Sequence, residues 1–152
     1  TPPEQYIVAL HGTSRVDKEW PIEIWHQFIP NMEAAGYSIF LPWGNTREYE
    51  RAKTLATAHK MTHVLPKCSL GELAGLLEKA SAVIGMDTGL MHIAAALNKK
   101  GIALYPVTQP TLTGVLSAGK QQGIESIGGK KALDTEQVSQ KMLQLLQDVV
   151  VQ

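Results

Sequence analysis

The chain has 152 residues, 44% of them hydrophobic and 18% charged, which is the composition of an ordinary globular protein and argues against a disordered chain. Basic and acidic side chains number 14 each, so the formal net charge is zero and a nucleic-acid partner is not expected. The single cysteine, Cys68, excludes an intrachain disulfide. No apolar run approaches the roughly 20 residues that span a bilayer, and the chain does not start with the basic residues of a signal peptide. We therefore expect a cytoplasmic location.

The first predicted elements are a strand, a loop and a helix. The apolar run YIVAL (6–10) predicts a buried strand. The polar loop HGTSRVDKEW (11–20) leads to Pro21, which suits the first turn of a helix, and Gly36 is placed to end that helix. A second proline inside the helix removes a backbone hydrogen bond, which predicts a kink or break near residues 26–30.

The next predicted elements repeat this alternation. The run YSIFLPW (37–43) is apolar and partly aromatic, which is typical of a strand. Asn45, with Glu48 three residues later, resembles a capping box and predicts a helix that ends near residue 59. A third short strand is predicted at HVLP (63–66), where the helical pattern has ended.

The next predicted elements are a helix that begins with a capping-box pattern and a strand–turn–helix unit. Ser69 and Glu72 form an S-x-x-E capping box in front of the helical run LAGLLEKA. The apolar run SAVIGMD (81–87) predicts a fourth strand, and LMHIAAALN (90–98) has helix formers at helical spacing. The DTG triplet between them is therefore a turn from the end of a strand into the start of a helix.

The last predicted elements complete an α/β pattern. The run GIALYP (101–106) predicts a fifth strand, residues 124–127 predict a short sixth strand, and Asp134 with Gln137 caps a final helix. The apolar face of that helix consists of Val138, Met142, Leu145 and Val149. Alternating strands and helices predict a Rossmann-like, three-layer α/β sandwich with a parallel sheet of five to six strands, forming one domain over residues 1–152.

Polar residues follow the predicted strands, at the edge of the sheet where ligands bind in open α/β folds. Thr13, Ser14 and Lys18 follow the first strand and can supply hydroxyl donors and a positive charge. The backbone amides of Thr88 and Gly89 lie where the helix after the DTG turn begins, and a helix N-terminus favours anions. Together these groups predict a site for a phosphate or a pyrophosphate.

Glu48 makes a nucleotide the better prediction than bare phosphate. It lies at the end of a neighbouring strand, where an acidic side chain commonly accepts hydrogen bonds from ribose hydroxyls. The chain contains neither G-x-G-x-x-G after its first strand nor G-x-x-x-x-G-K-[ST], which argues against an ordinary NAD-binding domain and a P-loop enzyme. The DTG triplet of aspartic proteases belongs to an all-β fold, so that interpretation is set aside.

Four phrases in fixed order carry a family resemblance: HGTSRVDKEWP (11–21), LPWGNTREYERAK (41–53), LPKCSL (65–70) and MDTGLMHIAAAL (86–97). Together they resemble the nucleotide-sugar-binding, C-terminal half of the lipopolysaccharide heptosyltransferases, which are glycosyltransferases of the GT-B fold, and most of all their heptosyltransferase I branch. The resemblance implies transfer of L-glycero-D-manno-heptose from ADP-heptose to the Kdo region of lipid A in lipopolysaccharide inner-core biosynthesis. It implies an inverting mechanism without a metal ion or another cofactor.

The resemblance also assigns roles to residues. The donor diphosphate is assigned to Thr13, Ser14, Lys18, Thr88, Gly89 and His92. The adenine pocket is assigned to Leu65, Pro66, Lys67, Cys68 and Ser69. Glu48 would hold the ribose, and Asp87 would bind heptose hydroxyls. Two positions depart from the family pattern, since Ser14 stands where a second threonine is usual and Cys68 where methionine is expected.

The part of the enzyme that the resemblance does not cover is the N-terminal, acceptor-binding domain. The family's general base is an aspartate of that domain, so no catalytic residue is assigned in this chain, and the isolated chain is expected to be inactive. Kdo-lipid A would be bound through the missing domain, which would also make any peripheral contact with the inner face of the inner membrane. The chain is therefore expected to be the donor half of a longer protein.

Other interpretations stay open at this point. Lys18 also fits a solvated loop lysine, Glu48 and Asp87 fit helix caps, and His92 fits a packed histidine. His59 and His63 are four residues apart but no third metal ligand is evident in the sequence. A non-catalytic nucleotide or nucleotide-sugar binding module, or half of a nucleotide-sugar epimerase, would have a similar architecture.

Overall fold

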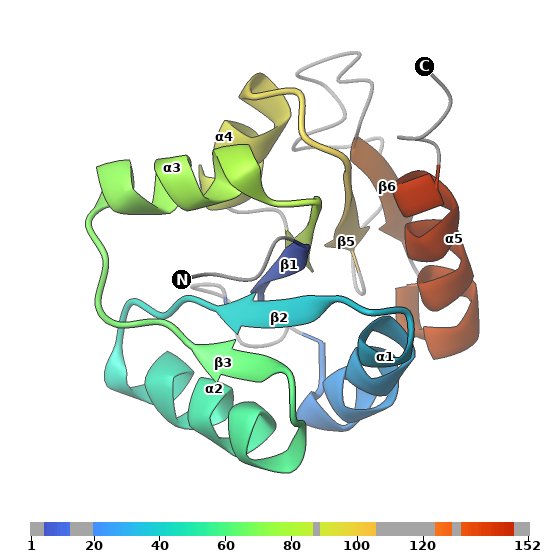
Figure 1. Cartoon of the computed structure of the whole chain (residues 1–152), viewed down its shortest axis with the longest axis horizontal. Helices are drawn as coiled ribbons and strands as arrows, with labels where there is room; N and C mark the ends of the chain where they lie inside the picture. Colours follow the sequence, from blue (N-terminus) through green and yellow to red (C-terminus); the bar gives the residue numbers. More distant parts are fainter. Residues whose placement is uncertain (1–4, 13–19, 87–88, 106–123, 129–131, 148–152) are drawn as a thin grey trace.

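The computed structural model describes residues 5–12, 20–86, 89–105, 124–128 and 132–147. In this part of the chain six parallel strands form one sheet in the order β3-β2-β1-β4-β5-β6, with helices on both faces (Figure 1). The strands are β1 (Tyr6–Leu10), β2 (Ser38–Leu41), β3 (Thr62–Val64), β4 (Ala82–Met86), β5 (Gly101–Tyr105) and β6 (Ile124–Gly128). The helices are α1 (Ile22–Ala34), α2 (Thr46–Ala58), α3 (Leu70–Lys79), α4 (Gly89–Ala96) and α5 (Thr135–Gln147).

The strand order reverses at β1, which pairs with β2 on one side and β4 on the other. In the β1–β4 register Leu10 lies opposite Gly85, so the carboxyl ends of these two strands are adjacent. In a doubly wound sheet of this order, ligands bind in the crevice outside the carboxyl ends at the reversal point. The predicted α/β sandwich with a parallel sheet is confirmed, with six strands.

Each face of the sheet has its own hydrophobic core. Side chains point alternately to the two faces of a strand, so Ile7 and Ala9 of β1 pack with α1, α2 and α5, while Tyr6, Val8 and Leu10 pack with α3 and α4. All five side chains of β1 are buried. A central parallel strand that is covered on both faces therefore reads as a continuous apolar run, as YIVAL does.

The predicted break in α1 is wrong, because the helix continues through Pro30 to Ala34. Pro30 lies on the exposed face, so the carbonyl that loses its helical partner lies on the side nearer the solvent. The opposite face buries Trp25, Phe28 and Met32 completely, and this packing outweighs one missing hydrogen bond. Gly36 adopts a φ of 96° directly after the helix, which confirms the predicted stop.

Two indole rings support this core. Trp20 and Trp25 are fully buried, and their ring centroids lie 4.6 Å apart in an edge-to-face arrangement, so both indole rings are packing residues. Val149, predicted on the buried face of α5, lies outside the described residues, whereas Val138, Met142 and Leu145 are buried as predicted. None of the helices described here has the length and apolar character needed to cross a bilayer.

Candidate functional site

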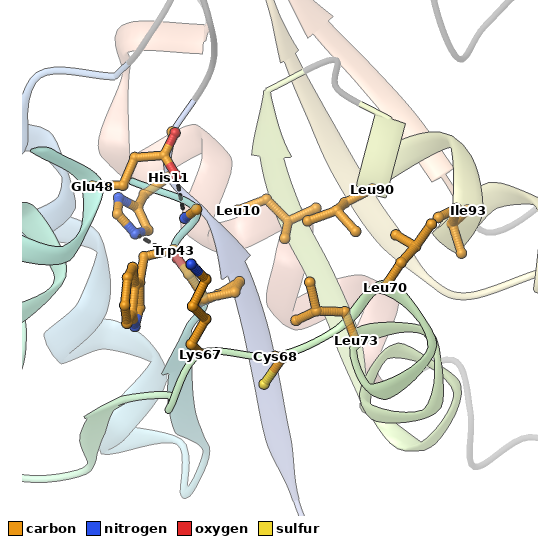
Figure 2. Close-up of a pocket in the computed structure, with 13 residues that line it drawn as sticks. Leu10, His11, Trp43, Glu48, Lys67, Cys68, Leu70, Leu73, Leu90 and Ile93 are labelled. Carbon is orange, nitrogen blue, oxygen red and sulfur yellow. Dashed lines mark hydrogen bonds between the residues drawn. The ribbon is translucent and has the colours of Figure 1, made fainter. Parts of the chain in front are cut away.

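A cavity of about 640 Å³ opens at the carboxyl edge of the sheet, near the reversal point (Figure 2). Its volume lies in the range of small-molecule sites, about 300 to 1,000 Å³. The cavity is lined by Leu10, His11, Gly12, Pro42, Trp43, Gly44, Glu48, Lys67, Cys68, Leu70, Leu73, Leu90 and Ile93. Polar groups from the ends of β1 and β2 lie on one side, and aliphatic side chains from the starts of α3 and α4 lie on the other (Figure 2).

Glu48 is positioned by the N-terminus of α2. The Asn45 side chain accepts a hydrogen bond from the Glu48 amide at 2.8 Å, and one Glu48 carboxylate oxygen, Oε1, accepts from the Gly44 amide at 2.7 Å. In a reciprocal capping box the Glu48 carboxylate would accept its bond from the amide of Asn45 and not from that of Gly44, so the predicted box is only half formed. The cap and the cavity therefore share the same carboxylate.

The Glu48 carboxylate lies against the backbone of Gly12 at the end of β1. A Cβ atom on Gly12 would lie 2.6 Å from the Glu48 Cδ and Oε2 atoms, which is closer than real Cβ contacts allow. The absence of a side chain at Gly12 thus admits the carboxylate to the space between the ends of β1 and β2. There it can accept hydrogen bonds from the hydroxyl groups of a ligand.

His11 joins the ends of the same two strands. Its ring is 1% exposed, and its Nε2 lies 2.9 Å from the carbonyl oxygen of Pro42. Because a carbonyl oxygen can only accept, Nε2 carries the proton in this contact. The sequence placed His11 in a ligand-facing loop but gave it no role, and its part in tying two loops together depends on the pairing of β1 with β2.

Lys67 and Cys68 are the two residues of the predicted adenine pocket that line the cavity. The Leu65 carbonyl accepts a hydrogen bond from the Trp43 indole at 2.7 Å, and Ser69 is the N-cap of α3. Burial raises the pKa of the Cys68 thiol, and the Glu72 carboxylate raises it further. The thiolate form is therefore disfavoured, which argues against Cys68 as a nucleophile.

An apolar wall on the other side of the cavity was not predicted. It consists of Leu70, Leu73, Leu90 and Ile93, from the first turns of α3 and α4. Leu70 is 63% exposed, and together with the other three side chains it forms an apolar surface that lines the cavity. The signal in the sequence was the pair of leucines at the start of α3, but only the packing of α3 beside α4 shows that they face a cavity.

Several predicted site residues lie outside the part of the chain that the structure describes: Thr13, Ser14, Lys18, Asp87 and Thr88. Gly89 is the first residue of α4, as predicted for a helix that begins at the DTG turn. His92 is exposed on the same helix, so it is not a core histidine. Among the described residues, no group of three histidine, cysteine or acidic side chains is arranged to hold a metal ion.

Residues 2–143 match the family model of glycosyltransferase family 9 (heptosyltransferase). Lipopolysaccharide heptosyltransferase 1 of Escherichia coli K12 is 45% identical over 118 residues, which cover 78% of this chain and 36% of that protein. The chain thus spans little more than a third of the length of this curated relative.

Solved structures give the same answer. The E. coli heptosyltransferase WaaC with ADP is similar at a TM-score of 0.81 and 36% identity, over 97% of this chain and 45% of that one. The same enzyme with ADP-2-deoxy-2-fluoro heptose is similar at a TM-score of 0.78 and 36% identity, over 92% of this chain and 43% of that one.

Proposed function

The chain belongs to glycosyltransferase family 9, the heptosyltransferases, and from that premise we propose that it is the donor-binding domain of a heptosyltransferase. The proposed donor is ADP-heptose, and the proposed reaction transfers its heptose to the Kdo region of lipid A with inversion. The similarity to lipopolysaccharide heptosyltransferase 1 and to WaaC with bound ADP supports this assignment. The acceptor site and the catalytic base belong, on this proposal, to the part of such an enzyme that this chain does not match.

The observation that carries the proposal is the two-sided cavity at the reversal point of the sheet. The Glu48 carboxylate offers an acceptor for ribose hydroxyls, and the segment around Lys67 and Cys68, facing the apolar wall, offers a slot for a flat base. The N-terminus of α4 lies at the end of β4, next to β1, where its amides and dipole favour a diphosphate.

The remaining donor contacts are proposed from the family resemblance. Thr13, Ser14, Lys18 and Thr88 would join Gly89 and His92 around the diphosphate, and Asp87 would hold the heptose. These groups bind and orient the donor, which contributes to catalysis by fixing the position of the anomeric carbon. A base that deprotonates the acceptor must lie on the opposite side of that carbon, so the isolated chain should bind ADP without transferring heptose.

Two alternatives are weaker. Half of a nucleotide-sugar epimerase is not favoured, because the family match is to heptosyltransferases. A non-catalytic nucleotide-binding module would also have this cavity, but it would have no specific preference for ADP-heptose. The same proposal puts the protein in the cytoplasm, with peripheral contact to the inner membrane made through the acceptor-binding domain.

Calorimetric titration of the purified chain with ADP, UDP and GDP tests the proposal. We expect ADP to bind more tightly than UDP and GDP by about tenfold or more, because polar groups that pair with one base are left unpaired by another. Equal affinities for the three nucleotides would indicate a general phosphate site. Failure of ADP to bind at all would overturn the assignment of the cavity.

A further inference from the structure

We propose that Trp43 is a positioning residue for nucleobase recognition, acting through the segment of residues 65–69 that we call the base loop. The inference rests on the proposed function, since it concerns the ADP part of the donor. Trp43 and Lys67 both line the cavity (Figure 2). Its contribution comes from what its indole N–H holds in place, and not from a contact with the base itself.

The beginning of the base loop is fixed on both sides of one residue, Leu65. The amide of Leu65 donates to the carbonyl of Leu41 at 3.1 Å, which extends the pairing of β2 with β3 by one bond. The carbonyl of Leu65 accepts from Nε1 of Trp43 at 2.7 Å. The next residue, Pro66, has no N–H to donate, and its carbonyl accepts a local bond from the Cys68 thiol at 3.2 Å. The bonds at Leu65 therefore tie the start of the loop to the sheet and to Trp43.

The end of the base loop is fixed by the capping box of α3. The Ser69 hydroxyl accepts from the Glu72 amide at 3.1 Å, and the Glu72 carboxylate accepts from the Ser69 amide at 2.7 Å. Lys67 and Cys68, the two residues that line the cavity, therefore lie between two restraints. The restraint at the end is built into the helix, and one of the two bonds at the beginning depends on the Trp43 side chain.

Trp43 is itself held firmly enough to act as a restraint. Its ring packs edge-to-face on Tyr49 of α2, with the ring centroids 4.9 Å apart. The preceding residue, Pro42, is tied to the end of β1 by the bond from His11. The following residue, Gly44, donates to the Glu48 carboxylate. The segment of residues 42–44, which holds the Glu48 carboxylate through the Gly44 amide, thus also holds the base loop, so the proposed ribose and base contacts keep one relative position.

The test compares the Trp43→Phe variant with the wild-type chain. Phenylalanine keeps the ring contact with Tyr49 but removes the indole N–H, so the carbonyl of Leu65 loses its donor while the Leu65 amide keeps its bond to Leu41. We expect ADP affinity to fall about five- to tenfold, which corresponds to the net contribution of one hydrogen bond. The affinity for inorganic pyrophosphate, which has no base, should not change. Amide hydrogen exchange at Lys67 and Cys68 should become faster in the variant.

Tyr6→Phe is the matched control. The Tyr6 hydroxyl donates to the carbonyl of Leu76 in α3 at 2.7 Å, so this variant also removes a bond from an aromatic side chain to a backbone carbonyl, outside the cavity lining. Its affinities for ADP and pyrophosphate should match those of the wild type.

Three results would overturn the inference: unchanged ADP affinity in Trp43→Phe, equal losses of ADP and pyrophosphate binding, or the same loss in Tyr6→Phe. Absence of ADP binding by the wild-type chain is a different result, which overturns the proposed function together with the inference. The two failures are therefore distinguishable.

Discussion

The carboxylate of Glu48 is shared between the cap of α2 and the cavity, since Oε1 accepts from the Gly44 amide and Oε2 lies beside Gly12. A local sequence pattern predicted the cap, and the position of Glu48 after the second strand predicted the ribose contact. The cap does not exclude a ribose contact, and the geometry leaves room for both. The residue can therefore be tested for its ligand role separately from its structural role.

Replacing Glu48 by glutamine should weaken ADP binding by about 1 kcal/mol, because a neutral amide oxygen is a weaker acceptor for ribose hydroxyls than a carboxylate. The glutamine oxygen can still accept from Gly44, so the fold should be retained. Calorimetry with ADP and 2′-deoxy-ADP checks this, and the variant should distinguish the two nucleotides less than the wild type does. Glu50→Gln, an exposed charge change on the same helix, is the control, and unchanged ADP affinity in Glu48→Gln would leave that residue only as a cap.

A pair of histidines joins α1 to the end of α2. His26 Nδ1 and His59 Nε2 lie 2.9 Å apart, and a contact of this kind needs one of the two nitrogens unprotonated. Burial lowers the pKa of His59 below its ordinary value of 6.5, His26 lowers it further, and Glu33 opposes the shift. Sequence spacing had directed attention to His63, but the partner of His59 comes from a different helix.

The lowered pKa of His59 gives stability a definite pH dependence. Between the folded pKa and 6.5 the unfolded chain binds more protons than the folded chain, so the free energy of unfolding decreases as the pH falls. The stabilisation is fully present above 6.5 and is lost as the pH falls through the folded pKa. Urea unfolding between about pH 5 and 8 should show a smaller dependence in His59→Gln, and an identical slope would contradict the role of the pair.

At the scale of elements, α3 shows how far local sequence signals reach. Its capping box was predicted from Ser69 and Glu72 alone, and both bonds are present. The box that Asn45 and Glu48 resembled is only half formed, because the Glu48 side chain finds the Gly44 amide instead. The break predicted in α1 is also wrong, because burial of one helix face stabilises the helix through tertiary packing, and a local rule for proline does not consider packing.

Ser69→Ala should lower the free energy of unfolding by about 1 kcal/mol, because an orphan amide in the first turn of α3 loses its acceptor. Thr57→Ala is the control, since the Thr57 hydroxyl donates to the Lys53 carbonyl in the last turn and a half of α2 and caps no helix. That change should stay within about 0.5 kcal/mol. Chemical denaturation of the two variants decides the matter, and equal effects would mean that the box contributes nothing beyond an ordinary surface hydroxyl.

The site itself was predictable only where a strand end and a loop motif coincide. Glu48, Lys67 and Cys68 line the cavity and were each predicted as ligand residues. The apolar wall was not predicted, because leucines at the start of α3 and α4 look like core residues until the two helices are placed side by side. The roles of His11 and Trp43 could not be read from the sequence, since their hydrogen bonds join segments that only the sheet brings together.

For the whole molecule, the order of the strands decides where a ligand can bind. Alternating elements predict a parallel sheet, but the order β3-β2-β1-β4-β5-β6 follows from long-range pairing and places the ends of β1 and β4 together. A second cavity, of about 390 Å³, lies away from this edge and includes Ser81, Asn98, Lys99 and Lys100. Its lysines donate to the carbonyls of Glu78 and Leu145 near the ends of α3 and α5, which is a structural role.

NMR titration of the isotope-labelled chain with ADP decides whether ADP, as part of the donor, binds at the carboxyl edge of the sheet. We expect saturable shifts of the backbone amides that line the first cavity, above all those of Gly12, Gly44, Glu48, Lys67 and Cys68. The amides of Ser81, Asn98, Lys99 and Lys100, around the second cavity, should not move. Saturable shifts confined to the second cavity, or no shifts at all, would show that ADP does not bind at this edge of the sheet.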